Sequence, residues 1–127
     1  ALLAPPGQLI AASRTRDGDV KGYLLSKDLM FTSQVHHAAG NAGIELTTIH
    51  QTSELDPEFE IAIVDLAFPG LDVSTAIADF KDAKIRVVAV GPHVQQERLA
   101  AAESAGAWQV LTKGQAHRDL ADVLNRL

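Results

Sequence analysis

Short apolar runs alternate with helical apolar stripes along most of the chain. Continuous apolar runs at 61–64 and 85–90 are typical of strands that are buried on both faces of a sheet. Between such runs, apolar residues recur at helical spacing, as Phe31, Val35 and Ala38 do. The pattern predicts four or five helices in alternation with five strands, which we place at 23–25, 44–49, 61–64, 85–90 and 110–111.

This alternation indicates the class of fold. Parallel strands require a crossover between them, and the crossover is right-handed in nearly all proteins. We therefore predict an α/β fold, with helices on both faces of a doubly wound five-stranded parallel sheet. Gly43 is expected to end the first helix, and Asp72 to begin a later one. Only about nine residues, including Pro57, join the second strand to the third, so the second helix is expected to be short or missing.

The two ends of the chain differ in pattern. Residues 1–20 contain the chain-breaking triplet Pro5, Pro6 and Gly7 and do not follow the alternation, so we predict a tail or linker there. Residues 21–127 form the predicted domain, whose last helix carries an apolar stripe. Its members are Leu120, Val123, Leu124 and Leu127.

Composition excludes several classes of function. The 127 residues are 46% hydrophobic and include no cysteine, which excludes a disulfide scaffold, a thiol nucleophile and a thiolate metal site. The 16 acidic and 11 basic side chains give a net charge of −5 without a run of lysine or arginine, so nucleic-acid binding is not expected. No apolar run is long enough to span a membrane. We expect a cytoplasmic protein.

The residues that follow the strands are the candidates for chemistry. Ligands of parallel sheets bind beyond the carboxyl ends of the strands. Those positions hold residues 26–28, His50, Asp65, Gly91 and Lys113. Asp65 and Lys113 suggest a carboxylate that acts as a nucleophile or metal ligand beside a neutralising cation. The alternative is that Asp65 caps a turn or helix.

Two motifs around these residues resemble a known family. Asp65 is followed four positions later by Pro69 and then by Asp72, immediately before a predicted helix. Residues 105–107 read Ala-Gly-Ala, and Lys113 follows the next predicted strand. Together the motifs resemble those of the receiver domains of two-component response regulators, over residues 22–127. The resemblance implies a flavodoxin-like fold with strand order 2-1-3-4-5, in a bacterial signalling protein that is not an enzyme. Asp65 is then equivalent to the phospho-acceptor, and Lys113 to the conserved lysine.

The sequence departs from this family where the chemistry is most demanding. Receiver domains carry a pair of acidic residues that helps to hold Mg²⁺, and here the equivalent positions are Ser26 and Lys27, followed by Asp28. A hydroxyl and an ammonium do not replace two carboxylates around a hard dication. We therefore expect no cofactor. As one hypothesis, Lys27 and Lys113 flank Asp65 and Lys27 replaces the charge of the metal; in the alternative, Lys27 extends into solvent.

The switching residues of the family are also replaced. Gly91 stands where receiver domains have a serine or threonine, and Val110 stands where they have an aromatic residue. Trp108 is a candidate interface residue, because tryptophan is enriched at binding hot spots; alternatively, it packs on the last helix. It enters the face of the fourth helix, fifth strand and fifth helix, which the resemblance implies for homodimers and partners.

Other kinds of site find little support. His36 and His37 are adjacent and point in different directions on a helix, and His50, His93 and His117 are isolated in sequence, so no metal site is expected. No glycine-rich nucleotide-binding motif is present.

The favoured function is therefore a degenerate receiver, or pseudo-receiver. It is expected to bind a protein partner or a fused output or kinase domain without being phosphorylated. Two alternatives remain: a working receiver phosphorylated on Asp65 with Mg²⁺, and a flavodoxin-like module that binds a small molecule.

Overall fold

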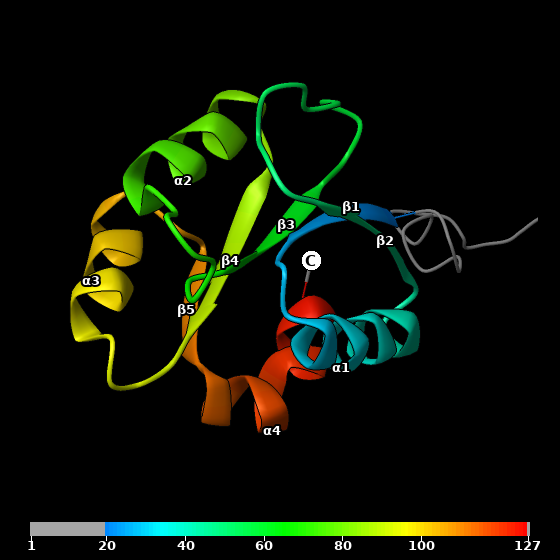
Figure 1. Ribbon diagram of the computed structural model, residues 1–127. Helices are drawn as coiled ribbons and strands as arrows, with labels where there is room; N and C mark the ends of the chain where they lie inside the picture. The colour runs from blue at the N-terminus through cyan, green and yellow to red at the C-terminus, as the bar shows by residue number, and fades with distance from the viewer. Residues whose placement is uncertain (1–19, 127) are drawn as a thin grey trace, which may run out of the picture.

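A five-stranded parallel sheet forms the centre of the molecule (Figure 1). The computed structural model describes residues 20–126. The order of the strands across the sheet is β2-β1-β3-β4-β5, and every neighbouring pair is parallel. The predicted sheet and its strand order are thereby confirmed. The strands are β1 (Val20–Leu25), β2 (Ile44–Ile49), β3 (Ile61–Asp65), β4 (Arg86–Gly91) and β5 (Gln109–Thr112).

Helices cover both faces of the sheet, as the doubly buried strands predicted. The part of the chain that the structure describes has four helices, which are α1 (Leu29–Asn41), α2 (Val73–Asp82), α3 (Gln96–Ser104) and α4 (Lys113–Leu124). In Figure 1, α1 and α4 lie together on one face and α2 and α3 on the other. Each pair encloses its own apolar cluster against the sheet.

Local sequence signals place the helix ends. The carboxylate of Asp28 accepts a hydrogen bond from the Phe31 N–H at the start of α1, and that of Asp72 accepts one from the Thr75 N–H at the start of α2. After α1 the backbone turns at Gly43, whose φ is 74°. This left-handed conformation is unfavourable for residues with a Cβ, and the glycine therefore ends the helix where predicted.

The connection between β2 and β3 contains no helix, which confirms the predicted loss of one crossover helix. Its residues cover the α2 side of the sheet in another way. The ring of Phe59 stacks on Tyr23 with the centroids 4.0 Å apart, and the Tyr23 hydroxyl accepts a hydrogen bond of 2.8 Å from the Asp56 N–H. Thr52 donates a hydrogen bond of 2.5 Å to Asp79 in α2. An aromatic stack and a few polar contacts thus take the place of a helix.

The centre of the sheet is the most deeply buried region. All five residues of β3 are buried, including Asp65 at its carboxyl end. The strand order reverses between β1 and β3, so the ends of these two strands form the switch point at which parallel sheets place their sites. Asp65 therefore lies beside the residues that follow β1.

Some predictions fall on residues that the structure does not describe. The tail or linker predicted at 1–20 lies outside the described residues except for Val20, which is the first residue of β1. Leu127, predicted in the last apolar stripe, also lies outside them. Between residues 20 and 126, no helix is both long enough and apolar enough to cross a membrane.

Candidate functional site

Asp65 is a buried carboxylate with partners on both oxygens. It is 1% exposed. Its Oδ2 accepts a hydrogen bond of 2.9 Å from the Ser26 hydroxyl, and its Oδ1 accepts one of 3.0 Å from the Ala67 N–H. The Lys113 Nζ lies 3.4 Å from Oδ1, so the predicted proximity of Asp65 and Lys113 is present. The hydroxyl and the amide satisfy the buried charge together with the lysine.

Lys113 is held from a second direction by an aromatic ring. Its ammonium lies 3.8 Å from the centroid of the Phe31 ring in α1, a cation–π arrangement. Lys113 is the first residue of α4, directly after Thr112, whose side chain forms a reciprocal capping box with Gln115. The cap and the ring together direct the lysine toward Asp65.

Lys27 does not flank Asp65, and the hypothesis that it replaces the charge of a metal is wrong. Its side chain is exposed, with Nζ 5.1 Å from the centroid of the Phe68 ring. Successive side chains in extended backbone point in opposite directions, and here Ser26 is the one that points inward. Within residues 20–126, the single ion pair of Asp65 is the one with Lys113.

The residues in the place of the acidic pair do not fit Mg²⁺, the ion that the receiver resemblance implies. Ser26 contributes a hydroxyl that is already donated to Asp65. The Asp28 carboxylate is turned to the start of α1, where it accepts from the Phe31 N–H at 3.1 Å. Mg²⁺ requires an octahedral set of oxygen ligands, usually with one or two carboxylates facing it. In the described part of the chain, no three His, Asp or Glu side chains are grouped closely enough to hold a metal ion.

Gly91 lies against a leucine that occupies the space of a side chain. A Cβ added at Gly91 would lie 2.9 Å from the Leu66 Cβ and 3.2 Å from its Cδ1. Leu66 is fully buried, and its N–H donates a hydrogen bond of 2.8 Å to the Val90 carbonyl. Val110, at the other altered switch position, is partly buried against the same apolar cluster. Both positions are thus part of the packing of the core.

Arg98 is a site residue that the sequence did not reveal. Its guanidinium donates hydrogen bonds of 2.5 Å to the Leu66 carbonyl and 3.2 Å to the Phe68 carbonyl, and so ties α3 to the loop after Asp65. Because its partners are backbone oxygens, no residue type at any spacing signals the contact. An arginine on a predicted surface helix is also too common to be informative.

Trp108, His36 and His50 have partners other than Asp65. Trp108 is partly buried against the cluster beneath α1 and α4, with the Arg86 guanidinium 5.2 Å from its ring centroid. It precedes β5 and so lies at the amino-terminal ends of the parallel strands, whereas Asp65 lies at their carboxyl ends. The His36 Nε2 is 3.2 Å from the Thr48 hydroxyl, and the His50 ring lies 6.4 Å from that of Phe68.

The strand order, the buried aspartate at the end of β3 and the lysine after β5 define a receiver-type fold. Solved structures agree with this class. A response regulator receiver domain from Clostridium thermocellum is 17% identical, with a TM-score of 0.70 over 84% of this chain and 92% of that chain. A CheY-like receiver domain from Methanospirillum hungatei is 15% identical, with a TM-score of 0.68 over 84% of this chain and 91% of that chain.

A third structure belongs to a protein described as pilus assembly-related, from Burkholderia pseudomallei. It is 23% identical, with a TM-score of 0.66 over 87% of this chain and 90% of that chain. No protein-family model and no curated protein sequence matches the chain. At these identities the similarity establishes the fold, and the predicted resemblance to receiver domains is confirmed at that level.

Proposed function

We propose that this chain is a pseudo-receiver: a signalling domain of receiver type that acts by binding a protein and is not phosphorylated on Asp65. The observation that carries the proposal is the closed set of contacts around Asp65. One oxygen accepts from Ser26, and the other accepts from Ala67 and faces Lys113. A nucleophilic carboxylate needs an oxygen that is free to attack, whereas this side chain is 2% exposed and its oxygens already have partners.

The electrostatics of the site support the same conclusion. Transfer of a phosphoryl group places new negative charge beside the aspartate, and receptive sites neutralise it with a metal ion and cations. Lys113 supplies one positive charge, which Asp65 already balances. Ser26 is the residue that faces Asp65 from the end of β1, and it carries no charge. A phosphoryl group on Asp65 would therefore add negative charge that Lys113, already paired with Asp65, does not neutralise.

Steric arguments add to the electrostatic ones. The resemblance to receiver domains implies a serine or threonine at the end of the fourth strand, whose hydroxyl would bond the phosphoryl group. Gly91 provides no hydroxyl, and Leu66 fills the space that a side chain would need. Arg98 binds the Leu66 and Phe68 carbonyls at the start of the loop after Asp65, which opposes the loop movement that would open this space.

The signalling part of the proposal rests on the likeness to receiver domains. We infer a cytoplasmic bacterial protein of a two-component type of pathway, whose partner is a separate protein or a fused output or kinase domain. The Asp65–Lys113 pair then has a structural role, because removing either charge would leave the other unpaired at the end of a buried strand.

Incubation with acetyl phosphate and Mg²⁺, followed by intact mass spectrometry, tests the loss of phosphorylation. We expect no phosphoryl adduct on the natural sequence. The double variant Ser26→Asp/Lys27→Asp restores the two carboxylates and shows whether their loss alone prevents the reaction, and Asp65→Asn shows whether any adduct depends on Asp65. An adduct on the natural sequence that disappears in Asp65→Asn would refute the proposal and identify a working receiver.

A further inference from the structure

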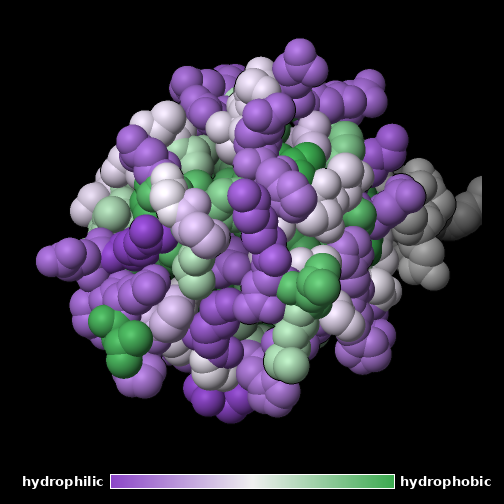
Figure 2. All heavy atoms as spheres, in the orientation of Figure 1, coloured by the Kyte–Doolittle hydropathy of each residue, from purple (hydrophilic) through white to green (hydrophobic). Residues whose placement is uncertain are grey.

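The surface of α1 differs from that of every other helix in residues 20–126. Its 13 residues include no Asp, Glu, Lys or Arg, whereas α2, α3 and α4 each carry at least three such residues. Two of its large apolar side chains are exposed, Leu29 to 86% and Met30 to 73%. In Figure 2, a compact apolar cluster in the region of α1 stands out from a largely hydrophilic face. Depletion of charge around exposed apolar side chains is the composition of an interface core.

The exposed residues form one face of the helix. Leu29, Ser33 and Gly40 follow a helical spacing on the side opposite the buried Phe31 and Val35. Gly40 has no role in the packing of the monomer, since a Cβ added there would meet nothing within 4 Å. A glycine in an exposed helix costs about 1 kcal/mol relative to alanine. The outward face of α1 therefore carries large apolar side chains in its first turn and has open space at Gly40 in its last turn.

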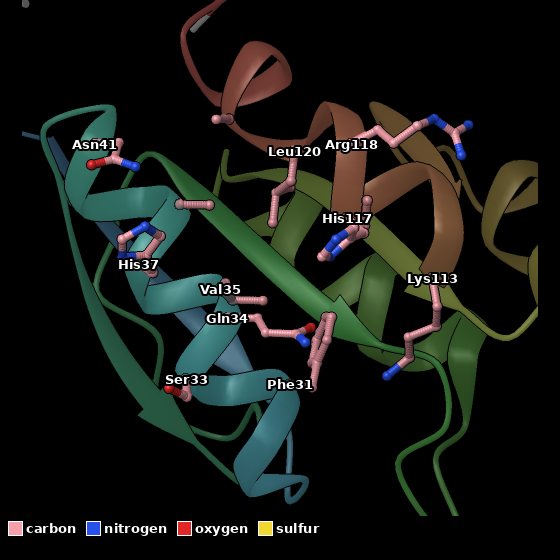
Figure 3. A pocket seen from close by; sticks show the side chains of 13 residues that line it. Phe31, Ser33, Gln34, Val35, His37, Asn41, Lys113, His117, Arg118 and Leu120 are labelled. Atoms are coloured by element: carbon pink, nitrogen blue, oxygen red, sulfur yellow. The ribbon is translucent and has the colours of Figure 1, made fainter.

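A groove continues this face toward α4. It has a volume of about 550 Å³ and runs between the two helices. Figure 3 shows Phe31 and Gln34 of α1 on one side of the groove and His117 of α4 on the other. No Asp or Glu lines it, although the whole chain has a net charge of −5. Lys113 and Arg118 of α4 do line it, so the surface without acidic groups extends beyond α1 and carries two basic residues on its α4 side.

We propose that a second copy of this chain occupies the surface, with the two α1 helices packed antiparallel about a twofold axis. In a twofold interface, a contact between two positions occurs twice, once from each copy, so the surface must be complementary to itself. Antiparallel pairing places Leu29 of each copy over Gly40 of the other, a large side chain against an open position. Met30 of each copy then enters the Asn41 end of the other's groove.

Charge favours this face over the others for self-association. Two copies of a chain with a net charge of −5 repel one another, and a contact over α2 or α3, which each carry two acidic residues and one basic residue, would add to this repulsion. The α1 helix adds none. It is about 20 Å long, so one helix pair is a small interface, and the dimer is a weak one that forms at high protein concentration. This inference is independent of whether Asp65 is phosphorylated.

Sedimentation velocity over a series of protein concentrations tests the dimer with the full chain. We expect a reversible dimer whose dissociation constant rises at least about tenfold in Met30→Glu, since the axis brings two new carboxylates into the contact. Ala100→Glu places the same charge on an exposed residue of α3 and serves as the matched control. A chain that stays monomeric at every concentration overturns the proposal. A dimer that only Ala100→Glu weakens also overturns it, in favour of a face formed by α3.

Disulfide trapping tests the antiparallel arrangement, because the natural chain contains no cysteine. In a mixture of Leu29→Cys and Gly40→Cys chains, we expect the mixed disulfide dimer to dominate. Two Leu29 positions would be about 16 Å apart along the helices, beyond the reach of a disulfide, so the Leu29→Cys chain should not pair with itself. Ala78→Cys, exposed on α2, measures random collision. Mixed dimers no more frequent than this background would exclude the pairing.

Discussion

The substitution Gly91→Ala tests whether the position of the family's hydroxyl residue is closed by the core. Gly91 is the buried last residue of β4, and Leu66 lies directly against it. The added Cβ would lie 2.9 Å from the Leu66 Cβ, whereas ordinary van der Waals contacts of a Cβ begin at 3.4 Å. The overlap is about half an ångström, and it involves a β-carbon that cannot move without its backbone.

The magnitude follows from how firmly Leu66 is held. Its N–H is bonded to the Val90 carbonyl at 2.8 Å, and its carbonyl accepts from Arg98. Relief of the overlap must therefore strain β3, β4 or the loop after Asp65. Overpacking of this kind typically costs about 1–3 kcal/mol. In a domain of this size each 1 kcal/mol lowers Tm by roughly 4–8 °C, so we expect a decrease of at least about 4 °C.

Urea and thermal unfolding followed by circular dichroism measure the effect. Gly40→Ala is the matched control, because the same methyl group enters open space on a helix and should stabilise the chain by up to about 1 kcal/mol. The measurements are made at low protein concentration, so that self-association does not contribute. A Gly91→Ala chain as stable as the natural one would refute the argument, because the end of β4 could then accept a side chain.

Four further outcomes are expected around Asp65. Ser26→Ala should destabilise the chain by about 1–3 kcal/mol in urea unfolding, because a buried carboxylate oxygen loses its donor; an unchanged midpoint would contradict the contact. Lys113→Met should cost about 2 kcal/mol, less than a fully buried pair because the lysine is 31% exposed, and equal stability would argue against a structural pair. Arg98→Gln should speed hydrogen exchange in the loop after Asp65, with little change in β1 as the internal control. Millimolar Mg²⁺ should leave the Tm of the natural chain unchanged but raise that of Ser26→Asp/Lys27→Asp, and a Tm increase in the natural chain would indicate a metal site.

Much of the fold could be predicted from the sequence because periodic patterns report burial directly. The continuous apolar run that became β3 is buried at every residue, as expected of a central parallel strand. Caps are equally local: Asp72 begins α2 and Gly43 follows α1 because each acts on a backbone within a few residues. The missing helix between β2 and β3 was predictable from the length of the connection and from Pro57.

The site was predictable only in part. Strand ends in a parallel sheet share one edge, which is why Asp65 and Lys113 could be paired from their positions alone. The direction of a side chain just beyond a strand depends on where the strand stops. The sequence therefore allowed either Ser26 or Lys27 to face Asp65, and only the tertiary structure decided for Ser26.

Alone, the sequence determined the elements, their alternation and the residues that lack the family's chemistry, since each of these is a property of residue type and spacing. The tertiary structure decided which groups touch. Leu66 closes the space at Gly91, Arg98 binds the loop after Asp65, and the uncharged residues of α1 gather on one exposed face. Such contacts depend on the packing of strands and helices distant in sequence, and local patterns do not encode that packing.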